Sequence, residues 1–554
     1  MATGPVLADP IPPPPPFHHP ALGTIRGISK NGAYQYLGIK YATLENRLAE
    51  PRLMQYNGDG EINATMHGAP VVSPEFSYDM EAAFIHRGLP KDEIPPISDL
   101  DGLNLNLTLP AKGGKDLPVV VYIHGGGFAF GSSWYPHYDQ SKVISLAEEM
   151  NQSIIGVNFN YRLGVPGFLT SKEFESAGIT GNRGLQDIRV ALQWVQKYIL
   201  GFGGDPGKIT VVGQSAGGGK SAINYLLHSD EPLFDQAMLL GGTFLMMRPS
   251  SQETTDKQYE AIVKHLGLED LEPAERINAF LTMPSERFVN DMAPEMMSLT
   301  VALGGPLVPG LATFANLTNS DELPLPGRRW CKRVFTLDSQ FDGSIMGQAS
   351  LNDRESGIKE RFCTAMEQNL GTHAAAKLLE QYEIAPETSD SEALLKILQI
   401  VTDISFFAPS FRMAELFDSD EQKWYMGFFN ERNPWDGIYK GRANHLLDVS
   451  FIWGNYNQSY PARCWTVARA LAETLINFTF GNDDGEGALP RFDTAVEARN
   501  RLVKIYGPSD DGIDSKVVQF GDERATQRSL KIFKLADQTP GGLDALLDAI
   551  MAFL

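Results

Sequence analysis

The amino-acid sequence predicts an α/β fold in which helices cover both faces of a large, mostly parallel sheet. Strand-like apolar segments recur along the chain at 35–43, 118–126, 153–162, 208–213, 235–242, 333–340 and 423–430. Several of them are apolar at consecutive positions, which is typical of strands buried on both faces. Helical patterns separate them, for example 185–199, where apolar residues recur every three to four positions. This alternation favours parallel strands joined by crossover helices.

The domain organisation follows from changes in composition along the chain. Residues 1–23 include the run Pro12 to Pro16, which predicts a stiff proline-rich arm outside the fold. Residues 24–554 show no break that would mark a linker, so we expect one domain. Within it, 251–300 and 351–420 have helical patterns and no comparable buried strand, so we expect helical insertions beside the sheet.

Bulk composition limits the class of protein and its partners. The chain has 554 residues, is 43% hydrophobic and carries a formal net charge of −21. This charge disfavours nucleic acid as a partner, because polyanions need a basic surface. We find no signal-peptide pattern and expect no membrane span. Three cysteines in no metal-like spacing fit free thiols in a reducing compartment, so we expect a cytoplasmic protein.

A glycine-rich turn at 208–227, "KITVVGQSAGGGKSAINYLL", allows two interpretations. Its Gly-Lys-Ser ending is similar to a phosphate-binding P-loop, which needs a glycine five positions before Gly219. That position is Gln214, so the P-loop spacing fails. The sequence Gly213-Gln214-Ser215-Ala216-Gly217 does fit the G-x-S-x-G turn of a nucleophilic serine between a strand and a helix. We therefore expect Ser215 to be a nucleophile, with a helix following over 216–227.

A second glycine-rich segment lies at 122–133, "YIHGGGFAFGSS", directly after a predicted strand. Gly125 to Gly127 let the backbone expose amide donors at this place. Acyl transfer needs such donors because its tetrahedral intermediate carries an oxyanion. The two glycine-rich segments together therefore indicate acyl-transfer chemistry.

Several long motifs, in order along the chain, resemble the type-B carboxylesterase family, which includes the cholinesterases. The resemblance runs from about residue 23 to about 480 and is densest in "YLGIKYA", "NLNLTLP", "HGGGF", "NFNYRLGVPGFL", "NRGLQDIRVALQWVQKYILGFGGDPGKITVVGQSAGG" and "GRANHLLDVSFIWG". The chain looks closer to fungal intracellular members than to animal esterases. The resemblance implies an α/β-hydrolase fold whose helical insertions form a gorge or lid.

The resemblance also implies the site residues, in the family's order of serine, acid and histidine. Ser215 would be the nucleophile and His445, in "GRANHLLDV", the general base. The acid would be Asp342 in "TLDSQFDGSIMG", where relatives usually have glutamate, with Asp338 as the competing carboxylate. The oxyanion hole would consist of the backbone amides of Gly126, Gly127 and Ala216. No metal or organic cofactor is implied.

The chain departs from its relatives in ways that bear on function. The cysteines of the family's omega-loop disulfide and the choline-binding tryptophan are absent from the matching stretch at 73–103. Gln214 stands where a glutamate is common, and Gly241 where relatives have a serine that positions the acid. We expect a serine hydrolase acting on a hydrophobic ester or lactone. The alternatives are a specialised acyl transferase, lactonase or amidase, and a non-catalytic binding module. The oligomeric state is left open.

Overall fold

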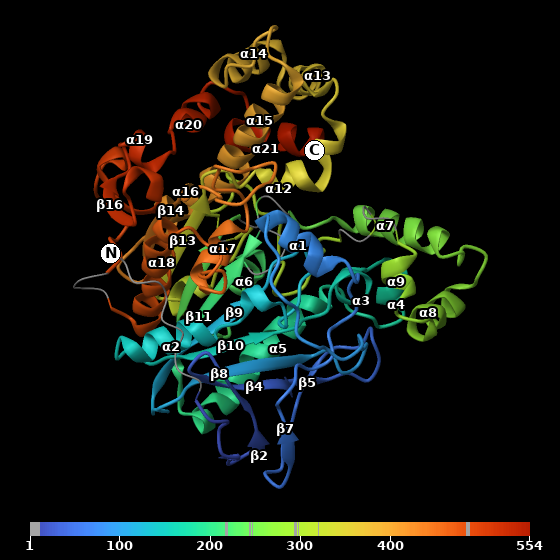
Figure 1. Cartoon of the computed structure of the whole chain (residues 1–554). Coiled ribbons are helices and arrows are strands. Elements are labelled where there is room, and N and C mark those ends of the chain that lie inside the picture. Colours follow the sequence, from blue (N-terminus) through green and yellow to red (C-terminus); the bar gives the residue numbers. More distant parts are fainter. Residues whose placement is uncertain are drawn as a thin grey trace.

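The computed structural model describes residues 11–215, 220–242, 245, 248–292, 296, 299–319, 321–482 and 488–554. In Figure 1 a central sheet crosses the molecule, with one group of helices (α7, α8 and α9) beside it and another (α13, α14, α15, α20 and α21) above it. The C-terminus lies in the upper group.

Within the described residues, eleven strands form the central sheet in the order β16-β15-β14-β13-β12-β11-β9-β10-β8-β4-β3. The strands from β15 to β10 in this order are mutually parallel, while β8, β4, β3 and β16 pair in antiparallel fashion at the two sides. The predicted α/β class with a large, mostly parallel sheet is therefore confirmed. The sheet strands are β3 (Ile28–Lys30), β4 (Ala33–Lys40), β8 (Asn104–Pro110), β9 (Leu117–Ile123), β10 (Ile155–Phe159), β11 (Gly204–Gln214), β12 (Gln236–Leu240), β13 (Arg333–Ser339), β14 (Lys423–Phe429), β15 (Leu502–Tyr506) and β16 (Ser515–Gln519).

The helices lie on both sides of this sheet and in the two regions where helical insertions were expected. Their bounds are α1 (Ser77–Ile85), α2 (Ser141–Glu149), α3 (Gly164–Phe168), α4 (Lys172–Ser176), α5 (Arg183–Tyr198), α6 (Lys220–Leu226), α7 (Gln252–His265), α8 (Pro273–Thr282), α9 (Arg287–Asn290), α11 (Gly327–Trp330), α12 (Ser344–Met346), α13 (Ile358–Leu370), α14 (Thr372–Gln381), α15 (Asp390–Val401), α16 (Ala408–Phe417), α17 (Leu447–Ile452), α18 (Ala462–Phe480), α19 (Glu523–Thr526), α20 (Lys531–Ala536) and α21 (Gly542–Phe553).

Strand β9 shows why the predicted strands are apolar at consecutive positions. Val119 and Val121 belong to one buried cluster, together with Trp194 of α5. Val120 and Tyr122 belong to a second cluster, together with α2 and α18. Because neighbouring side chains of a strand point to opposite faces, a strand covered on both faces must be apolar throughout.

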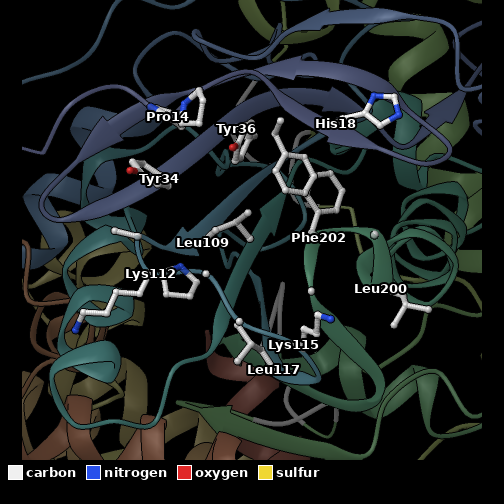
Figure 2. A pocket seen from close by; sticks show the side chains of 18 of the residues that line it. Pro14, His18, Tyr34, Tyr36, Leu109, Lys112, Lys115, Leu117, Leu200 and Phe202 are labelled. Atoms are coloured by element: carbon white, nitrogen blue, oxygen red, sulfur yellow. The ribbon is translucent and has the colours of Figure 1, made fainter.

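The end of the proline-rich arm differs from the prediction. Residues 17–19 form strand β1 (Phe17–His19), which pairs with β2 (Gly23–Arg26), and β2 in turn pairs with β7 (Glu61–Asn63). The Phe17 ring stacks on Phe202 with centroids 5.3 Å apart, and both side chains line a groove beside the arm (Figure 2). This part of the chain belongs to the fold because it covers apolar surface on η2 (Ile199–Phe202), a contact that proline content alone does not reveal.

One helical run is long and apolar enough to cross a membrane by length and composition. It spans Asp390–Phe417 and comprises α15, the π-helical turn η6 (Thr402–Phe407) and α16. The most apolar stretch of 18 residues in this run is 78% buried inside the protein. Its apolar side chains therefore face the rest of the chain, as in a core helix.

Candidate active site

Ser215 lies at the carboxyl end of β11, where the chain turns sharply. Its φ of +70° is in the left-handed region, which is uncommon for a residue with a β-carbon. This conformation directly after a buried strand is typical of a nucleophile turn. In such a turn the sharp, strained backbone exposes the serine hydroxyl at the end of the sheet. The helix expected at 216–227 is present from Lys220 as α6, and residues 216–219 lie outside the described residues. The predicted oxyanion donor Ala216 is among them.

The structure brings Ser215, His445 and Asp342 together from three distant parts of the chain. The distance between His445 Nε2 and Ser215 Oγ is 3.2 Å. The distance between His445 Nδ1 and Asp342 Oδ1 is 2.7 Å. His445 and Asp342 are buried, whereas Ser215 is partly exposed. The three side chains thus form a hydrogen-bonded chain that ends at an accessible hydroxyl.

Local hydrogen bonds hold the acid and the histidine in place. Asp342 follows β13, and its Oδ2 accepts a hydrogen bond of 2.7 Å from the Ser339 amide. The His445 amide donates to the hydroxyl of Ser344, at 2.9 Å. The competing carboxylate, Asp338, lies within β13 and accepts a hydrogen bond from the Ser410 hydroxyl. Asp342 is therefore the carboxylate that contacts His445.

The glycine loop after β9 lies beside Ser215. A β-carbon on Gly125 would stand 3.0 Å from Ser215 Cβ, so this close approach requires glycine. Gly126 has a φ of +100°, and its carbonyl accepts hydrogen bonds from two amides further along the loop, those of Ala129 and Phe130. Among the described residues, no acceptor is bonded to the amides of Gly126 or Gly127. Within the described part of the chain, these two N–H groups are therefore available to an oxyanion.

Gln214 makes a contact that the sequence did not predict. Its Nε2 lies 3.1 Å from His445 Nε2, about as close as Ser215 Oγ. The side chain is buried, and its Oε1 has no hydrogen-bond partner within the described part of the chain. Since Nδ1 of the imidazole faces Asp342, Nε2 is the hydrogen-bond acceptor and has one lone pair. Gln214 and Ser215 therefore compete for it.

Two ionisable groups near the site have shifted pKa values. Burial raises the pKa of Asp448 to about 7, and the nearby charge of Asp342 adds to this effect. Burial lowers the pKa of His124, in the glycine loop, to about 4, so this histidine is neutral at physiological pH. His124 stacks on Tyr161 with ring centroids 4.5 Å apart, which makes it a structural residue.

An aromatic ring packs against the histidine of the site. The Phe406 ring, in η6, lies 5.5 Å from the His445 ring, and both are buried. Trp134 and Tyr135, which follow the glycine-rich segment, are also buried. A void of about 10 Å³ near Ala129 is lined mainly by apolar residues, but neither Ser215 nor His445 lines it.

Comparison with known proteins agrees with this geometry. The model of the carboxylesterase family matches residues 15–520. The chain belongs to the carboxylesterase family. It is 28% identical over 457 residues to the para-nitrobenzyl esterase of Bacillus subtilis, covering 78% of this chain and 82% of that one. It is 29% identical over 414 residues to the phenmedipham hydrolase of Pseudarthrobacter oxydans, covering 72% and 75%.

A solved structure of a PNB esterase superposes with a TM-score of 0.70 at 22% identity, covering 92% of this chain and 99% of that one. Together with the family match, this likeness confirms the predicted α/β-hydrolase fold. As a member of this carboxylesterase family, the protein is a serine hydrolase that acts on carboxylic ester bonds.

Sequence reasoning missed the contacts of three residues. The first is the contact between the side-chain amide of Gln214 and His445, although the sequence does show that glutamine stands here in place of the common glutamate. Ser344, whose hydroxyl binds the His445 amide, carried no signal apart from its position two residues after Asp342. Asp448 is buried near His445 because of the turn at Leu446, and the sequence carried no signal of it apart from its position three residues after the candidate base.

Proposed function

We propose that Ser215, His445 and Asp342 are the catalytic triad of this esterase. The observation that carries the proposal is the continuous chain from Ser215 Oγ through His445 to Asp342, with distances of 3.2 and 2.7 Å. The strained backbone of Ser215 supports it, as do the amides of Gly126 and Gly127, to which no described acceptor is bonded. The third predicted donor, the Ala216 amide, remains a prediction.

In this mechanism His445 Nε2 takes the Ser215 proton while Oγ attacks the ester carbonyl. The amides of Gly126 and Gly127 stabilise the oxyanion of the tetrahedral intermediate. Asp342 holds the imidazole orientation and stabilises the imidazolium. His445 then protonates the leaving alcohol, and water, activated by His445 in turn, releases the acid from the acyl-enzyme.

The substrate we propose is a hydrophobic ester or lactone. The Phe406 ring against His445 supports this choice, because an apolar ring beside the triad favours an apolar acyl or alcohol group. Hydrolysis of p-nitrophenyl esters of increasing chain length tests it: we expect kcat/KM to rise with chain length. A preference for the acetyl ester would contradict the proposal.

The triad is tested by substitution in the same assay. We expect Ser215→Ala to lower kcat by about 10⁶-fold and Asp342→Asn by about 10⁴-fold. Asp338→Asn is the matched control, because Asp338 accepts a hydrogen bond from the Ser410 hydroxyl, whereas His445 Nδ1 faces Asp342. Loss of activity in Asp338→Asn with an active Asp342→Asn variant would overturn the assignment of the acid.

Two further features of the proposed function have separate tests. Mass spectrometry of the products in the presence of alcohols distinguishes hydrolysis from acyl transfer, and we expect the free acid. We also propose a cytoplasmic location, supported by the free thiols Cys331, Cys363 and Cys464. Imaging of the tagged full-length chain in its source cells tests this location, and a secreted product would contradict it.

A further inference from the structure

A buried arginine lies behind the turn that holds Asp342. Arg528 is 2% exposed and follows α19 in the segment after β16. Gln527, just before it, has a φ of +55°, so the chain turns sharply at this point. Arg528 also lies beyond 15–520, the part of the chain that the family model matches. The esterase mechanism described above assigns no step to this side chain.

Backbone and side-chain acceptors hold the guanidinium of Arg528 in place. Its Nη2 donates to the carbonyl of Asp338, near the end of β13, at 2.7 Å. Its Nη1 lies 3.3 Å from Asn430 Oδ1 and 3.2 Å from the carbonyl of Gln527. The guanidinium carbon lies 4.7 Å from the ring centre of Phe428, on the neighbouring strand β14. The guanidinium is therefore fixed in direction and makes a short hydrogen bond to β13.

The charge of Arg528 is compensated by acids around the end of β13. A deeply buried charge is costly unless opposite charges or hydrogen bonds compensate it. Burial lowers the pKa of Arg528, and the negative charges of Asp338, Asp342 and Asp403 oppose this effect. These three acids come from β13, from the turn after it and from η6. The guanidinium therefore lies within electrostatic reach of the triad acid.

One peptide group connects Arg528 to the triad. The carbonyl of Asp338 accepts the hydrogen bond from Arg528. The amide of the same peptide, that of Ser339, donates to Asp342 Oδ2 at 2.7 Å, and Asp342 Oδ1 lies 2.7 Å from His445 Nδ1. Hydrogen bonds in series polarise one another, so a donor at the carbonyl makes the amide a stronger donor. Arg528 is thus linked to His445 through one peptide and one carboxylate.

We propose that Arg528 is a positioning residue of this esterase. It fixes the 338–339 peptide, so that the Ser339 amide holds Asp342 in the orientation that His445 needs. This inference rests on the proposed triad, because Arg528 acts through Asp342. It gives the C-terminal segment a part in the reaction that is separate from those of the serine turn and the glycine loop.

Substitution of Arg528 by glutamine tests the proposal with p-nitrophenyl butyrate. Arg528→Gln should lower kcat about 10–100-fold, because small displacements of a catalytic group are costly, and should leave KM within about twofold. Arg333→Gln is the matched control. Arg333 is also buried, donates to a backbone carbonyl, that of Phe478, and lies against an aromatic ring, but it stands at the other end of β13. Equal kcat in the two glutamine variants would overturn the proposal.

A double-mutant cycle shows whether the effect passes through Asp342. In the Asp342→Asn background, Arg528→Gln should change kcat by less than about twofold, because the carboxylate that Arg528 positions is gone. A loss of the same size as in the unsubstituted background would overturn the proposal. Failure of the triad itself would look different, because Asp342→Asn alone would then keep its kcat. If Asp342→Asn loses activity and Arg528→Gln does not, this inference alone fails.

Arg528→Lys covers the case in which the glutamine variant does not fold, which circular dichroism reports. Lysine keeps the positive charge, but its single ammonium group cannot replace the planar fork that bonds to the Asp338 carbonyl and Asn430 Oδ1 together. We expect kcat to fall by about fivefold or more relative to Arg333→Lys, again only while Asp342 is present. Equal kcat in the two lysine variants would overturn the proposal.

Discussion

Gln214→Glu provides a sharp test of how this active site differs from those of its relatives. The Gln214 amide donates to His445 Nε2 at 3.1 Å, where Ser215 Oγ stands at 3.2 Å. A glutamate in this place would put a negative charge beside the imidazole. It would favour the protonated ring, which cannot accept the Ser215 proton. The variant should therefore lose activity at low pH.

The size of the effect follows from the distance. At 3.1 Å, Coulomb's law with an effective dielectric constant of about 20 gives about 5 kcal/mol as an upper bound. Burying the new carboxylate costs part of this. We expect the midpoint of the acid limb of kcat/KM to move up by about 1–3 pH units in Gln214→Glu.

Gln214→Leu is the matched control, since it removes the amide without adding charge. It loses a hydrogen bond to the neutral imidazole worth about 0.5–1.5 kcal/mol, so the midpoint should move up by about 0.4–1 pH unit. The assay is kcat/KM for p-nitrophenyl butyrate from pH 5 to 9.5, which reports ionisations of the free enzyme. Midpoints that agree within about 0.3 pH unit in all three proteins would refute the competition between Gln214 and Ser215.

Two further substitutions test the surroundings of the triad. A β-carbon on Gly241 would lie 3.1 Å from His445 Cε1 and 3.2 Å from Asp342 Oδ1, so Gly241→Ala should lower kcat at least tenfold with little change in KM. Gly267 has a φ of +71°, and a β-carbon there would have no heavy atom within 4 Å. Gly267→Ala is therefore the control for backbone strain without a contact to the triad, and it should keep its kcat. Asp448→Asn should stabilise the protein more at pH 8 than at pH 5, by about 2–3 kcal/mol in urea denaturation. The reason is that the raised pKa of Asp448 makes the unsubstituted protein lose stability as pH rises from about 4 to 7. An equal gain in the free energy of unfolding at both pH values would contradict this prediction.

The acid of the triad shows where sequence reasoning reached its limit. Asp338 lies inside the predicted strand at 333–340, and Asp342 lies two residues beyond it. The structure agrees, because β13 ends at Ser339, with Asp338 in the sheet and Asp342 in the turn after it. What the sequence left open is which carboxylate reaches His445, because that contact joins residues 103 positions apart.

The sequence by itself determined the parallel sheet, the nucleophile turn and the glycine loop, because each depends on periodicity or on residues adjacent in the chain. Apolar runs such as that of β9 and the glycines around Ser215 are local signals of this kind. The tertiary structure alone decided which groups meet at His445: Gln214 is 231 positions away and Asp342 is 103 positions away. It also decided that residues 17–19 join the fold and that Arg528 reaches the peptide behind Asp342. Contacts between distant segments depend on how the sheet and its connections pack, and no local pattern in the chain records them.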